Sequence, residues 1–212
     1  MKLTVFGASG GIGGHLVDQA LARGDEVTAV VRDAGRFQRR SPGLHVAEVP
    51  DLSDVDTLRL AVEGRDAAVS GVGPRSRKDT SVASSTGIGI LRALDLAGVR
   101  RFVAVTAAPV APAAPDDGFL NRRVVFPFFG WMLRGIYDDL RRLEDAMRRS
   151  GLDWTAVRPP KLTDGPLTEK YRAVIGANVP RGFTVSRADV AHCMLAALDD
   201  PATIGQGVGV AK

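Results

Sequence analysis

The sequence predicts an α/β fold with a single doubly wound parallel sheet. Short apolar, β-branched runs alternate with longer segments whose apolar residues recur at helical spacing, and glycines or prolines separate the two kinds. We expect strands at 3–6, 26–32, 44–49, 67–70, 101–106 and 153–158, an edge strand at 205–210, and helices at about 12–21, 55–62, 81–97, 136–150 and 190–198. No linker or repeat divides the chain, so residues 1–212 are expected to form one domain.

Composition argues against several classes of protein. The net charge is +4, but the arginine pairs are dispersed and aromatic residues make up only 6% of the chain, so we expect no nucleic-acid partner and instead an anionic small molecule. No stretch approaches the roughly 18 apolar residues that a membrane span needs, and the first residues do not resemble a signal peptide. Cys193 is the one cysteine, which suits a reducing cytoplasm. A monomer or a homodimer is expected.

The most informative segment is a glycine-rich turn, Gly7-Ala-Ser-Gly-Gly-Ile-Gly13, between the first strand and the first helix. Such a turn aims free backbone N–H groups and the positive end of the helix dipole at a phosphate. Gly7 permits the turn, Gly10 lets a pyrophosphate approach the main chain, and Gly13 lets the helix lie close to the strand. The spacing is less specific than G-x-G-x-x-G, so a purely structural turn is the alternative interpretation.

Arginines follow the second strand, where the adenosine ribose of a dinucleotide would lie. An acidic residue at this point binds a ribose 2′-hydroxyl, whereas an arginine pairs with a 2′-phosphate. Arg32, with Arg36, therefore favours NADP(H) over NAD(H). The alternative is that these arginines form a solvated loop face.

Further candidates follow the third, fourth and fifth strands, because ligands of doubly wound sheets bind beyond the carboxyl ends of the strands. Asp51 and Leu52 lie where an adenine ring is expected, and Asp51 either accepts a hydrogen bond from the adenine amine or is a turn residue. Gly71 and Gly73 allow the chain to pass beneath a ribose. Thr106 ends the fifth strand, where its hydroxyl is expected to face a nicotinamide.

Two later segments border the same predicted crevice. Residues 109–134 interrupt the alternation of strands and helices. Three interpretations are open for this segment: a lid that forms an apolar substrate wall, a subunit contact, or part of the core. Pro159 and Pro160 follow the sixth strand and predict a rigid corner, which together with Lys161 is expected to border the nicotinamide. Ser186-Arg-Ala-Asp189 is typical of a capping box that opens a helix.

Together these residues resemble those of the NmrA-like, atypical short-chain dehydrogenase/reductase proteins, and most closely the biliverdin-IXβ (flavin) reductases among them. The resemblance extends over essentially the whole chain. Its landmarks are Gly7-Ala-Ser-Gly-Gly-Ile-Gly13, Val31-Arg-Asp33, Ser150-Gly-Leu-Asp-Trp-Thr155, Arg158-Pro-Pro160, Asp164-Gly-Pro-Leu-Thr168 and Ser186-Arg-Ala-Asp-Val190. It implies a Rossmann-like fold that binds NADP(H) and passes hydride to a small planar acceptor such as a flavin, tetrapyrrole or quinone.

The resemblance also implies roles for individual residues. The pyrophosphate would be held by Gly7, Ser9, Gly10, Gly11 and Ile12, the 2′-phosphate by Arg32 and Arg36, the nicotinamide ribose by Gly73 and Thr106, and the nicotinamide ring by Pro159 and Pro160. Two positions differ from the flavin reductase pattern, where Thr-Ser corresponds to Thr106-Ala107 and a histidine corresponds to Lys161. These differences weigh against a tetrapyrrole substrate.

The catalytic residues, for which Thr106 and Tyr137 are the candidates, are the least determined part of this prediction. Ordinary short-chain dehydrogenases use Tyr-x-x-x-Lys, in which the tyrosine protonates a carbonyl; the nearest match here is Tyr137-Asp-Asp-Leu-Arg141. Tyr137 is therefore either a proton donor or a packing residue. A flavin or quinone acceptor needs no tyrosine, because the protein has only to position two rings. The alternative function is an NAD(P)-binding redox sensor of the NmrA type without turnover.

Overall fold

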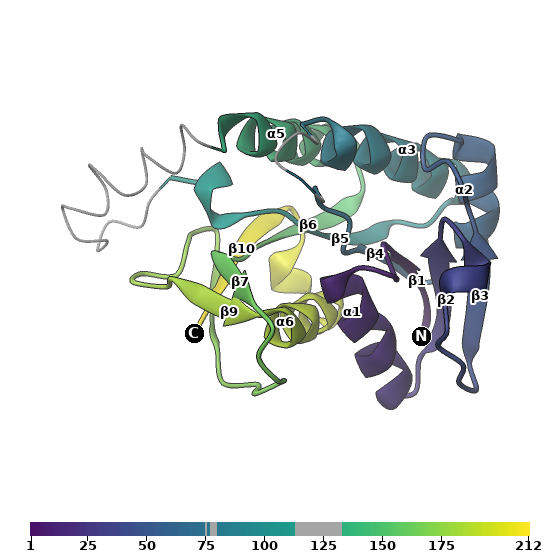
Figure 1. The fold of residues 1–212 in the computed structure, drawn as a ribbon. Coiled ribbons are helices and arrows are strands. Elements are labelled where there is room, and N and C mark those ends of the chain that lie inside the picture. The colour runs from purple at the N-terminus through teal and green to yellow at the C-terminus, as the bar shows by residue number, and fades with distance from the viewer. Residues whose placement is uncertain (75, 77–79, 113–132) are drawn as a thin grey trace.

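The computed structural model of the protein describes residues 1–74, 76, 80–112 and 133–212. A central sheet lies between two layers of helices (Figure 1). The helices α1 (Gly11–Ala22) and α6 (Arg187–Asp199) cover one face, and α2 (Val55–Val62), α3 (Val82–Ala97) and α5 (Arg134–Arg149) cover the other. The predicted doubly wound α/β fold is confirmed.

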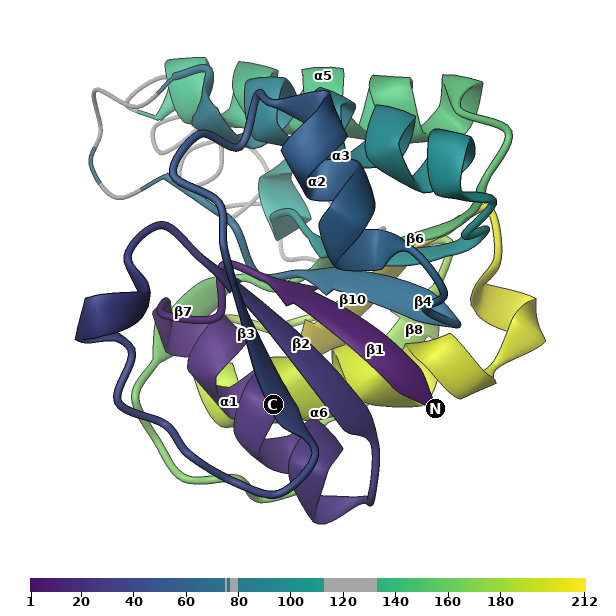
Figure 2. The same cartoon turned by 90° about the vertical axis from the view of Figure 1, so that its right-hand side faces the viewer.

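The strand order of the main sheet is β3-β2-β1-β4-β5-β6-β10-β8 within the described residues, and every neighbouring pair is parallel except β10 and β8. Figure 2 shows β3, β2 and β1 side by side, with α2 above them and α1 below. Two further strands, β7 and β9, pair in parallel as a small second sheet. The strands are β1 (Lys2–Phe6), β2 (Glu26–Val31), β3 (Leu44–Glu48), β4 (Ala67–Ser70), β5 (Arg101–Val105), β6 (Asp153–Arg158), β7 (Lys161–Thr163), β8 (Arg172–Ile175), β9 (Thr184–Ser186) and β10 (Gln206–Ala211).

The prediction of an edge strand at 205–210 is wrong, because β10 lies inside the sheet. It pairs with β6 on one side and with β8 on the other, and β8 forms the edge. Position 207 of β10 has to be glycine, because a Cβ there would lie 2.1 Å from the guanidinium carbon of Arg158. A strand containing glycines was compatible with an edge, but here a glycine makes room for a buried arginine.

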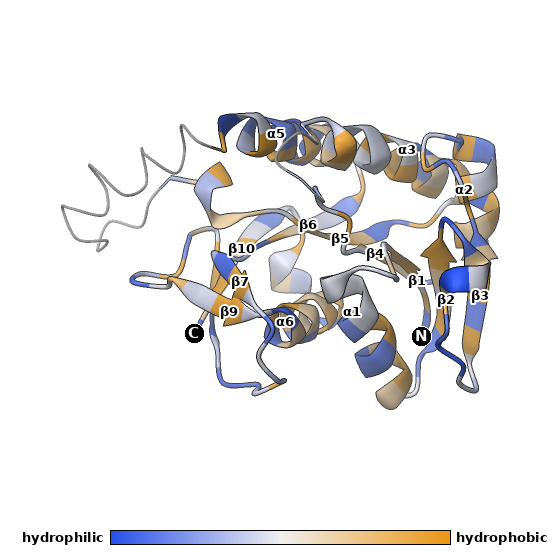
Figure 3. Ribbon diagram, in the orientation of Figure 1, coloured by the Kyte–Doolittle hydropathy of each residue, from blue (hydrophilic) through white to orange (hydrophobic). Residues whose placement is uncertain are grey.

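Alternate residues of the strands pack into two separate cores. In β2, Val27, Ala29 and Val31 face the layer of α1 and α6, whereas Val30 faces the opposite layer. Burial on both faces explains why the strands read as nearly continuous apolar runs. In Figure 3, hydrophobic and hydrophilic residues alternate along α5, as expected for a helix with one face on the sheet and one in solvent.

Local signals set the helix ends. The Asp54 carboxylate accepts hydrogen bonds from the backbone N–H groups of Asp56 and Thr57 and so caps α2. The Ser186 hydroxyl accepts from the Asp189 N–H at 2.9 Å and caps α6, which is one half of the predicted capping box, whereas the Asp189 carboxylate accepts from Thr168 and Glu169. Gly151 follows α5 with a φ of +71°, which suits the end of a helix.

Most of the predicted lid or contact segment, 113–132, lies outside the described residues, so its three interpretations stay open. Of the rest, Ala108–Val110 form a short 3-10 turn and α5 begins at Arg134. In the described parts of the chain, no helix is long and apolar enough to cross a membrane.

Candidate functional site

A cavity of about 950 Å³ opens at the carboxyl edge of the parallel strands. The loops that follow β1 to β6 all contribute to its wall, because parallel strands end at the same edge of a sheet. Fourteen of the residues predicted from the sequence line it: Gly7, Ser9, Gly10, Gly11, Ile12, Arg32, Asp51, Leu52, Gly71, Gly73, Thr106, Tyr137, Pro159 and Pro160. Residues far apart in sequence are thus brought to one cavity.

The glycine turn forms a bare main-chain cradle at one end of this cavity. Gly7 has a φ of +71°, and its carbonyl accepts from the Gly10 N–H at 2.8 Å. A Cβ at position 13 would lie only 1.9 Å from the Gly7 carbonyl oxygen, so the helix can approach the turn this closely only with glycine there. Among the described residues, none accepts a hydrogen bond from the N–H groups of Gly11 or Ile12, and both residues line the cavity. The cradle therefore offers free donors to an anion.

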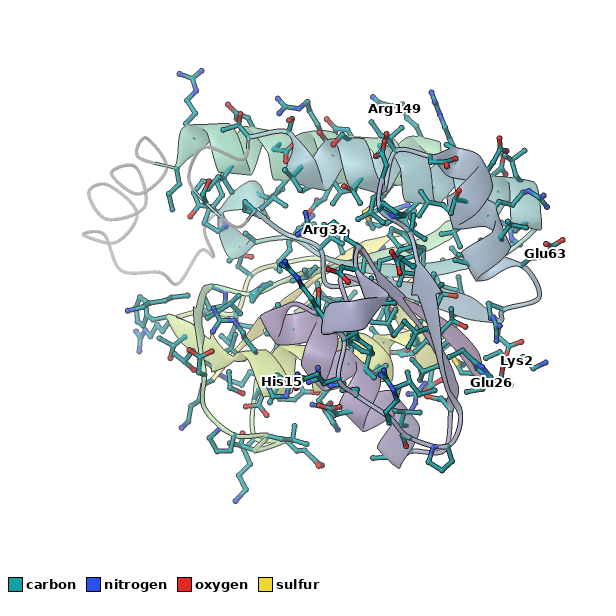
Figure 4. The ribbon with its side chains drawn as sticks, turned by 45° about the vertical axis from the view of Figure 1, so that its right-hand side comes forward. Lys2, His15, Glu26, Arg32, Glu63 and Arg149 are labelled. Carbon is teal, nitrogen blue, oxygen red and sulfur yellow. The ribbon has the colours of Figure 1, made fainter. Side chains whose placement is uncertain are left out.

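A second cavity, of about 380 Å³, adjoins the end of β2 and is lined by Ser9, Arg32, Asp33, Arg36 and Phe37. Arg32 lines both cavities. In Figure 4 its side chain extends from β2 toward the layer of α3 and α5, whereas His15 lies lower, along α1. Arg36 is 88% exposed and pairs with Asp33 at 3.1 Å. Arg32 and Arg36, the two residues predicted to bind the 2′-phosphate, thus flank one cavity, and Arg32 lies nearer the glycine cradle.

Asp51 lies in the wall after β3, beside Leu52. Its carboxylate accepts hydrogen bonds from the Ser53 backbone N–H at 2.8 Å and from the Ser53 hydroxyl at 2.7 Å. These hydrogen bonds hold the pKa of Asp51 below its usual value. The carboxylate is therefore ionised at neutral pH and can accept from an amine; it also has the hydrogen bonds of a turn residue, and the geometry is compatible with both interpretations.

A buried charged network lies behind the opposite end of the cavity. The Thr106 hydroxyl donates to Glu144 at 2.8 Å, and Glu144 has no exposed side-chain surface. Arg158 donates to the same carboxylate from Nε at 2.9 Å and from Nη2 at 2.5 Å. Because the Thr106 proton is engaged by Glu144, the oxygen can only accept a hydrogen bond from a group in the cavity. Glu144 was not singled out from the sequence, and Arg158 was named only within a landmark of the family resemblance, because no sequence pattern indicates that the two would meet.

Tyr137 lines the cavity, and burial raises the pKa of its phenol above the ordinary value. Arg141, four residues later, takes the place of the lysine in the short-chain dehydrogenase pattern but does not serve as one. Its guanidinium pairs with Asp138 at 2.7 Å and donates to the Pro109 carbonyl at 3.1 Å. Tyr137 therefore stays protonated at neutral pH.

Two residues at the rim differ from the sequence-based expectation. Lys161 is exposed and lines neither cavity. Successive residues of β7 point to opposite sides, so its neighbour Leu162 lines the main cavity, as does Pro160 before the strand. Arg187 was not predicted, yet it lines the cavity beside Gly11. A signal for Arg187 was present: an arginine at the first position of a helix is disfavoured by the helix dipole, so it needs a local reason.

This arrangement fits a dinucleotide. The cradle leaves no room for side chains at Gly13, supplies free N–H donors, and has arginines on both sides of it. The ionised carboxylate of Asp51 lies at one end of the cavity, and the Thr106 oxygen, a hydrogen-bond acceptor, lies at the other end.

Comparison with known proteins agrees with this geometry. A family model described as NAD(P)H-binding matches residues 7–201. The uncharacterised protein YwnB of Bacillus subtilis is 26% identical over 207 residues, covering 95% of this chain and 93% of that protein. A protein of Saccharomyces cerevisiae, YMR090W, is 28% identical over 214 residues, covering 95% and 88%.

Solved structures show the same fold. A short-chain dehydrogenase/reductase from Veillonella parvula in complex with NADP has a TM-score of 0.81 at 20% identity, covering 100% of this chain and 94% of that one. A proposed NADH-flavin reductase from Streptococcus pneumoniae has a TM-score of 0.77 at 22% identity, covering 100% and 99%. The NAD(P)H-binding family that the resemblance implied is confirmed by the family model, and these solved structures share its Rossmann-like fold. Since the matching model extends over residues 7–201 of 212, the chain belongs to the NAD(P)H-binding family.

Proposed function

We propose that this protein is an NADPH-dependent reductase that passes hydride to a planar conjugated acceptor, such as a flavin or a quinone. The observation that carries the proposal is the single cavity of about 950 Å³ that joins the glycine cradle to the corner at Pro159. Its volume lies at the upper end of the range of cofactor and ligand sites, as a site shared by a dinucleotide and an acceptor requires. The similarity to an NADP complex and to a proposed flavin reductase supports it.

In this proposal each end of the cavity holds a different part of NADPH. The N–H groups of the glycine turn bind the pyrophosphate, Arg32 pairs with the 2′-phosphate with help from Arg36, and Asp51 accepts from the adenine amine. Thr106 accepts a hydrogen bond from the ribose or the carboxamide beside the nicotinamide. When bound, the nicotinamide supplies the hydride.

The acceptor follows from the chemistry of the remaining wall. Val72, Val82, Ile136, Leu140 and Leu162 make this part of the cavity apolar, which suits a flat ring system. Arg141 stands at the lysine position of the short-chain dehydrogenase pattern and is paired with Asp138, and burial raises the pKa of Tyr137, so the site is poorly equipped to protonate an ordinary carbonyl substrate. A flavin or quinone takes its proton from water, and the protein then acts by aligning two rings.

The test is NADPH oxidation by the purified protein with flavins, quinones and simple enones, in parallel with calorimetric titration of NADP⁺. We expect steady turnover with at least one flavin or quinone and none with unconjugated ketones. Preference for ketones, or absence of dinucleotide binding, would contradict the proposal.

One observation favours a second candidate, an NAD(P)-binding sensor without turnover. The Thr106 proton is held by Glu144 and the Arg141 guanidinium by Asp138, so neither of these two groups is free to take part in proton transfer. Tight binding of NADP⁺ without oxidation of NADPH by any acceptor would identify this function instead.

A further inference from the structure

Arg187 occupies a position that helix electrostatics alone does not favour. It is the first residue of α6, where the dipole repels a cation, and the sequence otherwise places an acid, Asp189, in this first turn. Its aliphatic stem lies on the glycine turn: a Cβ at Gly11 would be 2.7 Å from the Arg187 Cδ and 2.9 Å from its Nε. The charged group is therefore held beside the free N–H donors at the start of α1.

The packing of α6 on α1 positions this side chain. Gln19 of α1 donates to the Ala188 carbonyl at 2.9 Å, and Arg23 donates to the Leu195 carbonyl at 3.3 Å. These contacts follow the same order along both helices, so the helices run in the same general direction, and the Arg187 stem over Gly11 places their first residues side by side. The starts of both helices and the Arg187 guanidinium consequently meet at the wall of one cavity.

The partner of Arg187 in this structure is weakly held. Nη1 of Arg187 pairs with the Asp164 carboxylate, which is 90% exposed, while the arginine side chain is 31% exposed. Ion pairs with a solvated partner contribute little to stability, because water screens the attraction. Arg187 can therefore leave Asp164 for a more strongly charged anion at little cost in free energy.

We propose that Arg187 is a cation of the pyrophosphate site, held over the glycine turn by Asp164 and transferred from that carboxylate to the pyrophosphate when the dinucleotide binds. The inference rests on the proposed function, in which a dinucleotide occupies the cradle. It assigns Arg187 a task that differs from that of Arg32. Arg32 reads the 2′-phosphate, which only NADP(H) carries, whereas Arg187 contacts a group common to NADP(H) and NAD(H).

Two substitutions of opposite effect test the inference by calorimetric titration with NADP⁺ and NAD⁺. Arg187→Gln keeps the stem over Gly11 but removes the charge, and we expect both dinucleotides to bind about tenfold more weakly, with an unchanged ratio between them. Asp164→Asn removes the competing anion, and we expect both to bind roughly two- to fivefold more tightly. Arg187→Lys should restore part of the affinity that glutamine loses, as a point charge does.

Arg100→Gln is the matched control, since it removes another arginine–aspartate ion pair, with Asp153, at the opposite edge of the sheet. It should change neither affinity by more than about twofold. Unaltered binding in Arg187→Gln, a loss confined to NADP⁺, or weaker binding in Asp164→Asn would overturn the inference. If Arg187→Gln does not fold, the dinucleotide affinity of Asp164→Asn tests the inference by itself. Wild-type protein that binds no dinucleotide would refute the proposed function, whereas failure of the inference leaves wild-type binding intact.

Discussion

The Thr106 hydroxyl donates a 2.8 Å hydrogen bond to Glu144, a carboxylate buried in the layer behind the cavity. Glu144 also binds Arg158 through two hydrogen bonds, so one buried anion connects the end of β5, the end of β6 and the middle of α5. This network holds the wall at the proposed nicotinamide end. It also determines which hydrogen-bonding role Thr106 offers to a ligand.

Removal of the buried anion should destabilise the protein strongly. Glu144→Ala leaves the Arg158 guanidinium buried and unpaired, and we expect a loss of about 3–5 kcal/mol in the free energy of unfolding, measured by urea denaturation. Asp145→Ala, which removes a neighbouring exposed carboxylate, is the control and should lose less than about 1 kcal/mol. Equal losses in the two variants would show that the network contributes little.

Gly13→Ala should damage both stability and dinucleotide binding. The added Cβ would lie 1.9 Å from the Gly7 carbonyl oxygen, so the turn or the helix has to move. We expect a loss of about 1–3 kcal/mol in thermal or urea unfolding, with binding of NADP⁺ abolished by calorimetry. Gly165→Ala is the control, because its Cβ would meet its nearest neighbour at an ordinary 3.6 Å. Wild-type NADP⁺ affinity in Gly13→Ala would rule out the cradle.

Arg32→Ala should remove most of the preference for NADPH over NADH. Loss of a charge-assisted contact with the 2′-phosphate is expected to weaken NADPH about tenfold or more and to leave NADH nearly unchanged. Dissociation constants for both nucleotides measure the effect. Arg39→Ala serves as the control, because Arg39 is engaged by Asp18 at 2.8 Å. A preference that survives in Arg32→Ala would assign the selectivity to other residues.

Tyr137 should contribute little to flavin reduction. Burial raises the pKa of Tyr137, so the phenol keeps its proton as the pH rises to its ordinary pKa of about 10 and beyond. We expect kcat/KM of the wild-type protein to show no tyrosine ionisation between about pH 6 and pH 9, and Tyr137→Phe to stay within about tenfold of it. A loss of several orders of magnitude in the variant would instead make Tyr137 a general acid.

Cys193 should be unreactive in the folded protein. It is buried in α6, and burial raises the pKa of its thiol to about 12, so almost no thiolate exists at neutral pH. We expect an aromatic disulfide reagent to modify it only as fast as the protein opens, and rapidly in urea. Fast modification of the native protein at neutral pH would show that this part of α6 is accessible.

Local features of the fold were predictable because they depend on neighbours in sequence. Helical spacing of apolar residues located α3 and α5 to within two residues, and the Ser186–Asp189 pattern placed the start of α6. The parallel alternation then brought Gly7, Arg32, Gly73 and Thr106 to one edge, since parallel strands end on the same side. The structure places these predicted residues at one cavity, and titration with the dinucleotide is what tests their roles.

Other features were not predictable, because they join segments whose pairing no local pattern encodes. Apolar periodicity indicates that a residue is buried, but it does not indicate which segment packs or pairs with it. For this reason β10 was wrongly predicted at an edge, and the strands β7, β8 and β9 were not predicted. In the same way Lys161 was expected at the cavity, although the alternation of β7 turns Leu162 toward it.

The sequence by itself determined the class of fold, the glycine cradle and the arginine after β2, because steric freedom and charge belong to the residues themselves. Only the tertiary structure decided that Glu144 holds the Thr106 proton and that Arg187 lies over Gly11. Both relationships depend on the packing of helices against the sheet and against each other, and that packing is fixed by the whole core.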